Sequence, residues 1–135
     1  MAFPVIENLL TTPENNLGSF VSHQIKQLCA YLGIKTELIH SSMIDKDNSL
    51  KGQKKVLQIC KKLSATHYVN AAGGKELYSK DIFLQSGISL NFIRTIPFDY
   101  KQFSDEHLPW LSIIDVMMFN PVAHIKELLN NYILE

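Results

Sequence analysis

The sequence predicts an α/β fold, in which a small parallel or mixed sheet of about three strands has helices packed on it and the C-terminus is helical. Three observations predict this fold. Apolar residues recur at helical spacing in several segments, short runs rich in β-branched and aromatic residues lie between them, and the two kinds of segment alternate along the chain. With 135 residues, the chain has the length of one ordinary domain with a single packed core.

The N-terminal part predicts a lead-in followed by a helix. Two prolines and an Asn pair interrupt residues 1–16, which we expect to be weakly structured, and residues 17–135 are expected to form the single domain. The first helix is predicted to begin near Ser19, a typical N-cap, and to end at Gly33, a typical C-cap. Its apolar stripe consists of Val21, Ile25, Leu28 and Leu32.

The next segments predict a strand, a loop and a second helix. Residues 35–42 alternate in a β-like pattern and lead into a polar loop at residues 43–48. Ser49 is the expected cap of the following helix, which carries an apolar stripe on one side and lysines mostly on the other. The stripe consists of Val56, Leu57, Cys60 and Leu63.

Two further strands and a short helix are predicted in the middle of the chain. Residues 67–69 form a short β-type run, and residues 88–96 form a longer one with β-branched and aromatic side chains. Between them, a short helix is expected, with Ser79 as its cap and Gly87 as its exit. Strands that alternate with helices predict parallel neighbours in the sheet.

The C-terminal part is predicted to be helical. Pro97 ends the third strand, and a polar loop runs from there to His107. Pro109 is expected to open a helix over PWLSIIDVMMF. Asn120 and Pro121 then break the helix and restart it in the pattern of an N-cap followed by a proline at the first helical position, and the restarted helix is expected to finish the chain.

Composition and charge exclude several function classes. Thirteen basic residues balance thirteen acidic ones, so we expect no nucleic-acid partner. No apolar run approaches the roughly 20 residues that cross a bilayer, and no signal peptide opens the chain, so we expect a cytoplasmic protein without a membrane span. Cys29 and Cys60 have no second Cys or His at ligand spacing, which favours buried thiols over a disulfide or a metal site. We expect no cofactor and no metal.

The glycine pair Gly73 and Gly74 follows the predicted strand at residues 67–69. Glycine allows positive φ and lets a ligand approach the backbone amides, and Lys75 could pair with a phosphate or a carboxylate. The spacing matches neither GxxxxGK[ST] nor GxGxxG. Ligands of open α/β sheets gather beyond the carboxyl ends of strands. A ligand-binding loop and a tight strand-to-helix turn with a solvated lysine therefore both remain open.

Two other groups of polar residues are candidates for chemistry. His67 and Asn70 flank the end of the same strand and could orient a substrate or transfer a proton, although such a histidine is often a structural residue. Asp115 lies in an otherwise apolar helical face, one turn after Ser112, and a carboxylate in such surroundings needs a hydrogen-bonded or charged partner. The alternative for Asp115 is a carboxylate that caps a neighbouring loop or pairs with a lysine.

Four segments form a distinctive combination: YLGIKTELIHSS at Tyr31, DNSLKGQKKVLQICKKLSATHYVNAAGGKELYS at Asp47, GISLNFIRT at Gly87 and PWLSIIDVMMFN at Pro109. Together they resemble the carboxyl-terminal half of the WbqC-like family, over about residues 17–134. The resemblance implies that the polar positions shared by the family form the site. These are Lys51, Gly52, His67, Asn70, Gly73, Gly74, Glu76, Tyr78, Ser112 and Asp115.

The resemblance implies a bacterial protein of surface-polysaccharide (O-antigen type) biosynthesis, and the family's labels imply an aminoacyl- or glycine-type transferase, or another group transferase, acting on an amino sugar. The implied partners are a nucleotide-linked amino sugar and a small acyl or aminoacyl donor. On this interpretation His67 or Asp115 is the general base, while Asn70 and Tyr78 orient the sugar or the donor. The Gly73 and Gly74 amides, with Lys75, would hold an anionic group.

Typical family members open with a strand and a QPxFxPWxGY-like segment, which this chain lacks. The alternative function is therefore a non-catalytic binding or assembly module, or an inactive folded fragment of a larger family member. An isolated half would bury its exposed face by self-association, so a homodimer is also expected. An enzyme and a non-catalytic module both remain open, and the sequence predicts neither the substrate nor a metal requirement.

Overall fold

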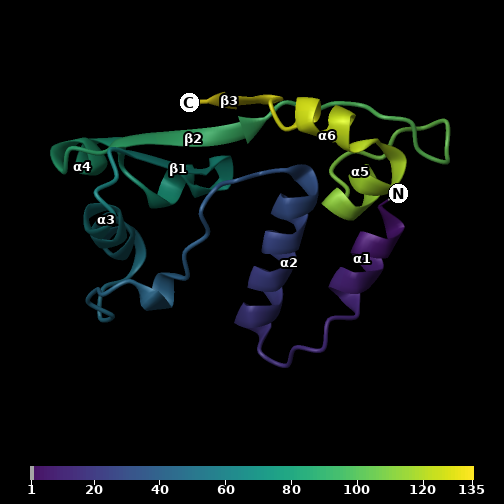
Figure 1. The fold of residues 1–135 in the computed structure, drawn as a ribbon. Coiled ribbons are helices and arrows are strands. Elements are labelled where there is room, and N and C mark those ends of the chain that lie inside the picture. Colours follow the sequence, from purple (N-terminus) through teal and green to yellow (C-terminus); the bar gives the residue numbers. More distant parts are fainter. Residues whose placement is uncertain (1) are drawn as a thin grey trace. The chain divides into compact units, whose positions relative to one another are not determined.

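The computed structural model describes residues 2–135, which fall into two compact units (Figure 1). The helical unit comprises the chain up to Leu38 together with Pro97–Asn131, and the sheet unit comprises Ile39–Ile96 together with Tyr132–Glu135. Each unit has its own cluster of buried apolar side chains. The single core predicted for the chain is therefore replaced by two cores, whereas the single domain predicted for residues 17–135 stays a prediction.

The helical unit consists of α1 (Phe3–Leu10), α2 (Leu17–Leu32), α5 (Ile113–Phe119) and α6 (Val122–Leu128). Helix α1 lies in the segment that was predicted to be weakly structured. Pro4 occupies its first turn, where proline is tolerated, and Ile6 and Leu9 are buried. The core of the unit contains Ala2, Ile6, Leu32, Val116, Met117 and Ile125.

The ends of the helices in this unit follow local hydrogen bonds. Helix α2 begins before the predicted cap, because Asn16 Oδ1 accepts the N–H of Ser19 at 3.0 Å. Gly33 ends the helix as predicted, with a left-handed φ of 69°. Helix α5 begins only after Ser112, since Trp110 has a φ of +62°, which no α-helix accommodates. Helix α6 has Pro121 as its N-cap, one residue later than predicted.

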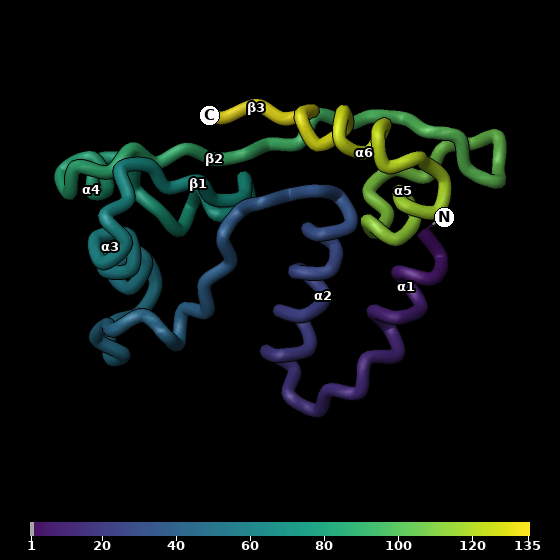
Figure 2. The backbone as a smooth tube through the Cα atoms, in the orientation of Figure 1, coloured from purple at the N-terminus to yellow at the C-terminus, as the bar shows by residue number. Residues whose placement is uncertain are grey.

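The sheet unit contains a mixed three-stranded sheet in the order β1-β2-β3. Strand β1 (His67–Ala71) is parallel to β2 (Ser89–Thr95), and β2 is antiparallel to β3 (Tyr132–Leu134), which runs beside it in Figure 2. The predicted α/β fold is thus confirmed. The unit also contains η1 (Ser41–Met43), α3 (Gly52–Lys62), η2 (Ala72–Leu77) and α4 (Lys80–Gln85). Its core consists of Leu57, Cys60, Phe83, Ile88, Leu90 and Phe92.

One of the three predicted strands, at residues 35–42, was wrong. Residues 35–40 form an exposed coil and residues 41–42 belong to η1, so the alternating pattern pairs with no strand. The last helix was predicted to reach the end of the chain, but α6 ends at Leu128, because asparagines follow and Asn130 Nδ2 donates to the Lys126 carbonyl at 3.1 Å. Strand β3 takes the third place in the sheet.

The short helices of the sheet unit confirm one predicted cap and correct another. Ser79 caps α4 through the Ile82 N–H at 3.5 Å. Ser49 does not cap α3, because its N–H and its hydroxyl both donate to Asp47 Oδ1, at 2.8 and 2.7 Å. Among residues 2–135, no helix is both long and apolar enough to span a membrane.

Candidate functional site

The loop after β1 lies where the sequence predicted a site. Asn70, near the end of β1, accepts the N–H of Ala71 through Oδ1 at 2.8 Å. A Cβ on Gly74 would lie 2.6 Å from Asn70 Nδ2, so glycine permits the loop to pack against this amide. Neither Gly73 nor Gly74 has a positive φ, which corrects the predicted reason for the pair. A Cβ on Gly73 would meet nothing within 4 Å, so the space beside it is open.

Lys75 is paired and does not stand alone in solvent. Its Nζ donates to Glu135 Oε2, and Arg94 Nε donates to Glu135 Oε1 at 2.7 Å. Lys75, followed by Arg94, lowers the pKa of Glu135 to about 2. Sequence reasoning missed Arg94 and Glu135, because no local pattern relates Lys75 to a carboxylate 60 residues further along the chain.

Tyr78 belongs to an aromatic cluster at the edge of the core. The ring of Tyr68 stacks on Phe83 with a centroid distance of 5.3 Å, and Tyr78 lies 6.0 Å from Tyr68 and 6.1 Å from Phe83. Burial, with a smaller contribution from Tyr78, raises the pKa of Tyr68 to about 12. Tyr78 is therefore held by packing, and its half-buried side chain lies between the core and the loop.

The other predicted residues of the sheet unit are exposed. His67 Nδ1 lies 2.9 Å from the Thr66 hydroxyl, Lys51 occupies the N-cap position of α3, and Glu76 lies in η2. Among residues 2–135, no hydrogen bond or ion pair joins His67 to Asn70 or Lys75. The structure thus brings Asn70 and Gly74 into contact and leaves His67 outside that contact.

The helical unit contains a second polar site around Asp115, in the first turn of α5. Tyr100 donates its hydroxyl to Asp115 Oδ2 at 2.5 Å, and Gln102 Nε2 donates to the same oxygen at 3.1 Å. We call these three half-buried residues the Asp115 cluster. Burial, together with the hydrogen bond to Asp115, raises the pKa of Tyr100. Ser112 caps α5 by accepting the N–H of Ile114 at 3.2 Å, and thereby fixes the turn that carries Asp115.

The Asp115 cluster is tied to the loop that follows Pro97. Gln102 accepts the N–H of Leu108 at 2.8 Å and donates to its carbonyl at 3.1 Å. The imidazole of His107 packs edge-on against the Tyr100 ring at 5.1 Å. The sequence predicted that Asp115 needs a partner, but it did not identify Tyr100 and Gln102. Their spacing of two residues, which places side chains on one face of an extended segment, is the signal that could have found them.

The arrangement at Asp115 suits proton transfer or the binding of an amine. Both donors of the Asp115 cluster contact Oδ2, and in residues 2–135 no hydrogen bond reaches Oδ1. A carboxylate held in one orientation with a free oxygen can accept a proton from a substrate or pair with a cation. No group of three or more His, Cys, Asp or Glu side chains in the described part of the chain could hold a metal ion.

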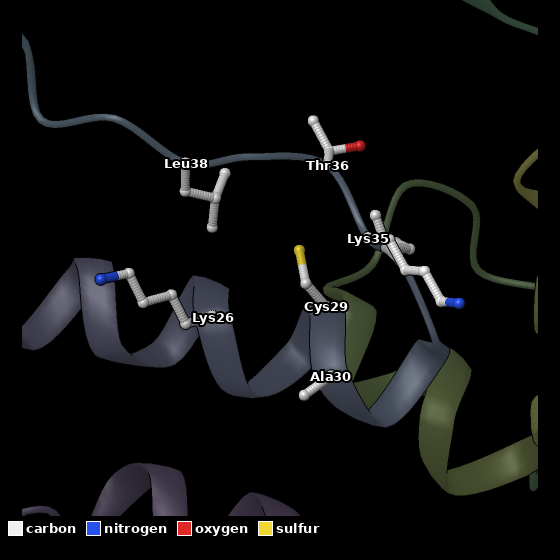
Figure 3. Close-up of a pocket in the computed structure, with 7 residues that line it drawn as sticks. Lys26, Cys29, Ala30, Lys35, Thr36 and Leu38 are labelled. Carbon is white, nitrogen blue, oxygen red and sulfur yellow. The ribbon is translucent and has the colours of Figure 1, made fainter.

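A cavity of about 230 Å³ lies between α2 and the segment that follows it (Figure 3). Figure 3 shows the thiol of Cys29 pointing from α2 toward Thr36 and Leu38, with Lys26 and Lys35 at opposite ends. Cys29 is half-buried, so it differs from the buried thiol that the sequence predicted, whereas Cys60 is buried. The two thiols therefore form a matched pair for measuring access.

We expect a neutral disulfide reagent, 4,4′-dithiodipyridine, to modify Cys29 well before Cys60. The side chain of Cys60 is only 5% exposed, and burial raises the pKa of its thiol, so less of the reactive thiolate is present. Peptide mass spectrometry over time gives the two rates. A Cys29→Ser variant should show only the slow reaction, and equal rates at the two positions would contradict the difference in burial.

Comparison with protein families gives a match over most of the chain. The family model described as the WbqC-like protein family matches residues 1–127. This range includes the segment before residue 17 and the Asp115 cluster, while Glu135 lies beyond it. No curated protein and no solved structure matches the chain.

Proposed function

This chain belongs to the WbqC-like protein family, and from that premise we propose that it acts in bacterial surface-polysaccharide biosynthesis as a group transferase on an amino sugar. The transferred group is an acyl or aminoacyl group, and the acceptor is the amine of the sugar. The observation that carries the proposal is the Asp115 carboxylate, which Tyr100 and Gln102 hold in one orientation.

Asp115 acts in this proposal as the general base. The nitrogen of the amino sugar forms a bond to the acyl carbon, the bond between that carbon and its carrier breaks, and the amine loses one proton. The carboxylate of Asp115 accepts this proton and then returns it to the departing carrier. Asp115 is preferred to His67, because among residues 2–135 the exposed ring of His67 has a hydrogen bond only with the adjacent Thr66 hydroxyl and is less firmly oriented.

Exposed aromatic side chains near Asp115 in the sequence support a sugar as the acceptor. Trp110 is 73% exposed, and Phe103 is 98% exposed although its ring lies 4.7 Å from that of Phe119. An exposed aromatic ring offers an apolar face on which the C–H face of a sugar can pack. The sheet unit contains Asn70, Lys75 and Tyr78, which stay predicted substrate-binding residues of that unit.

The test is a transfer assay with the purified chain. Nucleotide-linked amino sugars are incubated with acyl-carrier and aminoacyl donors, and mass spectrometry follows the products. We expect one donor class to be consumed, with an equal amount of sugar gaining the mass of the transferred group. Ligand binding without any product, over the whole panel, would contradict the transferase.

A non-catalytic binding module is the second candidate. Gln102 forms hydrogen bonds with both the N–H and the carbonyl of Leu108, so the Asp115 cluster also holds a loop in place. On this proposal the loop recognises a glycan precursor or a protein partner and consumes no substrate. The cytoplasmic location and the homodimer remain predictions, and light scattering of the purified chain measures the oligomeric state.

A further inference from the structure

Three segments of the sheet unit meet at one carboxylate. Lys75 comes from η2, Arg94 from β2, and Glu135 directly follows β3. The two cations bind different oxygens of Glu135, since Lys75 contacts Oε2 and Arg94 contacts Oε1 at 2.7 Å. Two cations that converge on one anionic group already have the arrangement that an oxyanion requires.

The sheet fixes the backbone on which this arrangement depends. The N–H of Glu135 donates to the carbonyl of Phe92 at 2.9 Å, and the Phe92 N–H donates to the Glu135 carbonyl at 2.8 Å. Residues opposite each other in an antiparallel pair, and residues two apart on one strand, share a face of the sheet. Glu135 and Arg94 therefore lie on the face of Phe92, and only the side chain of Glu135 has to turn for another anion to enter.

The charges and the exposure of the three side chains favour exchange. Two cationic side chains face one side-chain carboxylate, so one positive charge is left over, and the diphosphate of a nucleotide-linked sugar carries two negative charges where a carboxylate carries one. The side chains of Lys75, Arg94 and Glu135 are 48%, 52% and 30% exposed, and ion pairs this exposed stabilise a fold only weakly. Gly73 lies two residues before Lys75, and a Cβ on it would meet nothing within 4 Å.

We propose that Lys75 and Arg94 form a phosphate-binding site in which the carboxylate of Glu135 competes with the ligand. The phosphate belongs to a nucleotide-linked sugar, so this inference deepens the proposed function and rests on it for the identity of that sugar substrate. Glu135 acts as a gate, because its side chain must leave the two cations before a phosphate can replace it. The site also explains why Lys75, which follows Gly73 and Gly74, is paired with Glu135, which directly follows β3.

The ionisation of Glu135 is consistent with this role. Lys75 and Arg94 lower its pKa to about 2, from an ordinary value of 4.5. A lowered carboxyl pKa contributes stability above the unfolded-state value, and that contribution is lost as the pH falls toward 2. The competing carboxylate is therefore present throughout the neutral range, and its effect on ligand affinity should not change between pH 6 and 8.

The test compares Glu135→Gln with the wild type in titrations of pyrophosphate and of uridine diphosphate, followed by calorimetry and by amide chemical shifts. We expect Glu135→Gln to raise the affinity for both by about 2- to 30-fold, because it removes two exposed ion pairs that compete with the ligand. Adding Lys75→Gln or Arg94→Gln should abolish the gain. Asp45→Asn is the matched control, since it breaks the exposed pair with Lys62 at 3.1 Å in the same unit and should change nothing.

The outcomes separate this inference from the proposed transfer. Phosphate affinity is measured without the transfer reaction, so a failed transfer assay leaves it unaffected. An unchanged or lower affinity in Glu135→Gln, with an unchanged melting temperature, would show that Glu135 does not compete with a phosphate and would overturn the proposal. If Glu135→Gln does not fold, the wild type decides the question. Pyrophosphate must then change the amide chemical shifts of Lys75 and Arg94, and the absence of such a change would overturn the proposed site. Equal affinities for pyrophosphate and uridine diphosphate would show that the site takes the phosphates alone.

Discussion

Replacing Asp115 by asparagine is expected to slow the proposed transfer by about 10²–10⁴-fold, the range typical for the loss of a general base. The amide cannot accept the proton of the attacking amine. The fold should persist, because an amide oxygen can still accept the hydroxyl of Tyr100, which donates to Asp115 at 2.5 Å in the wild type. The measurement is the rate of product formation at saturating donor, with a thermal melt of each variant.

The matched control for Asp115→Asn is His67→Gln, because His67 and Asp115 are the two predicted candidates for the general base. His67 is exposed and its ring is hydrogen-bonded to the adjacent Thr66, so its replacement should change the rate by less than the replacement of Asp115. A loss of rate in His67→Gln, with full activity in Asp115→Asn, would transfer the role to His67. Unchanged rates in both variants would remove both residues from the chemistry.

Parts of the fold could be predicted because their signals are local. Strands β1 and β2 are runs of β-branched and aromatic residues bounded by turns, and the helices carry an apolar periodicity. Strand β3 has only three residues, and its place is set by pairing with β2, to which no local pattern points. Residues 35–42 have the opposite property, since their alternating pattern finds no partner strand.

The helix ends show why boundaries are harder to predict than elements. Asn16 and Ser19 are both good N-caps, and Ser49 donates to Asp47 although its residue type suits a cap of α3, so sequence alone does not decide which side chain bonds which amide. Trp110 delays α5 through a left-handed φ, and that conformation has no signal in its residue type.

The candidate sites were predictable only as single residues. Asp115 was identified because a carboxylate in an apolar face needs partners, and the structure provides Tyr100 and Gln102. The path of the loop decides which of its polar side chains reach Asp115, and the sequence does not give that path. Lys75 was identified by its position after the strand, but its competitor Glu135 follows from the pairing of β3.

Replacing Phe83 by alanine is expected to lower the free energy of unfolding by about 3–5 kcal/mol, the range for large aromatic residues in a core. Phe83 is 0% exposed and stacks on Tyr68 at 5.3 Å, so its removal leaves a cavity beneath the aromatic cluster. Denaturant-induced unfolding, followed by circular dichroism, gives the change. Phe103→Ala is the control, because that side chain is 98% exposed and should cost well under 1 kcal/mol.

The same variant tests whether the two units form one domain. Phe83 belongs to the core of the sheet unit, and the core of the helical unit is a separate cluster. If the chain unfolds as a single cooperative domain, as the sequence predicts, Phe83→Ala must accelerate amide hydrogen exchange in α2 as much as in β2. If the units unfold separately, exchange in β2 rises alone. The ring centroid of Tyr78 lies 6.1 Å from that of Phe83, and Tyr78 directly follows η2, which carries Lys75. In that case phosphate affinity should fall as the sheet unit loses stability, while the amides of α2 stay protected from exchange.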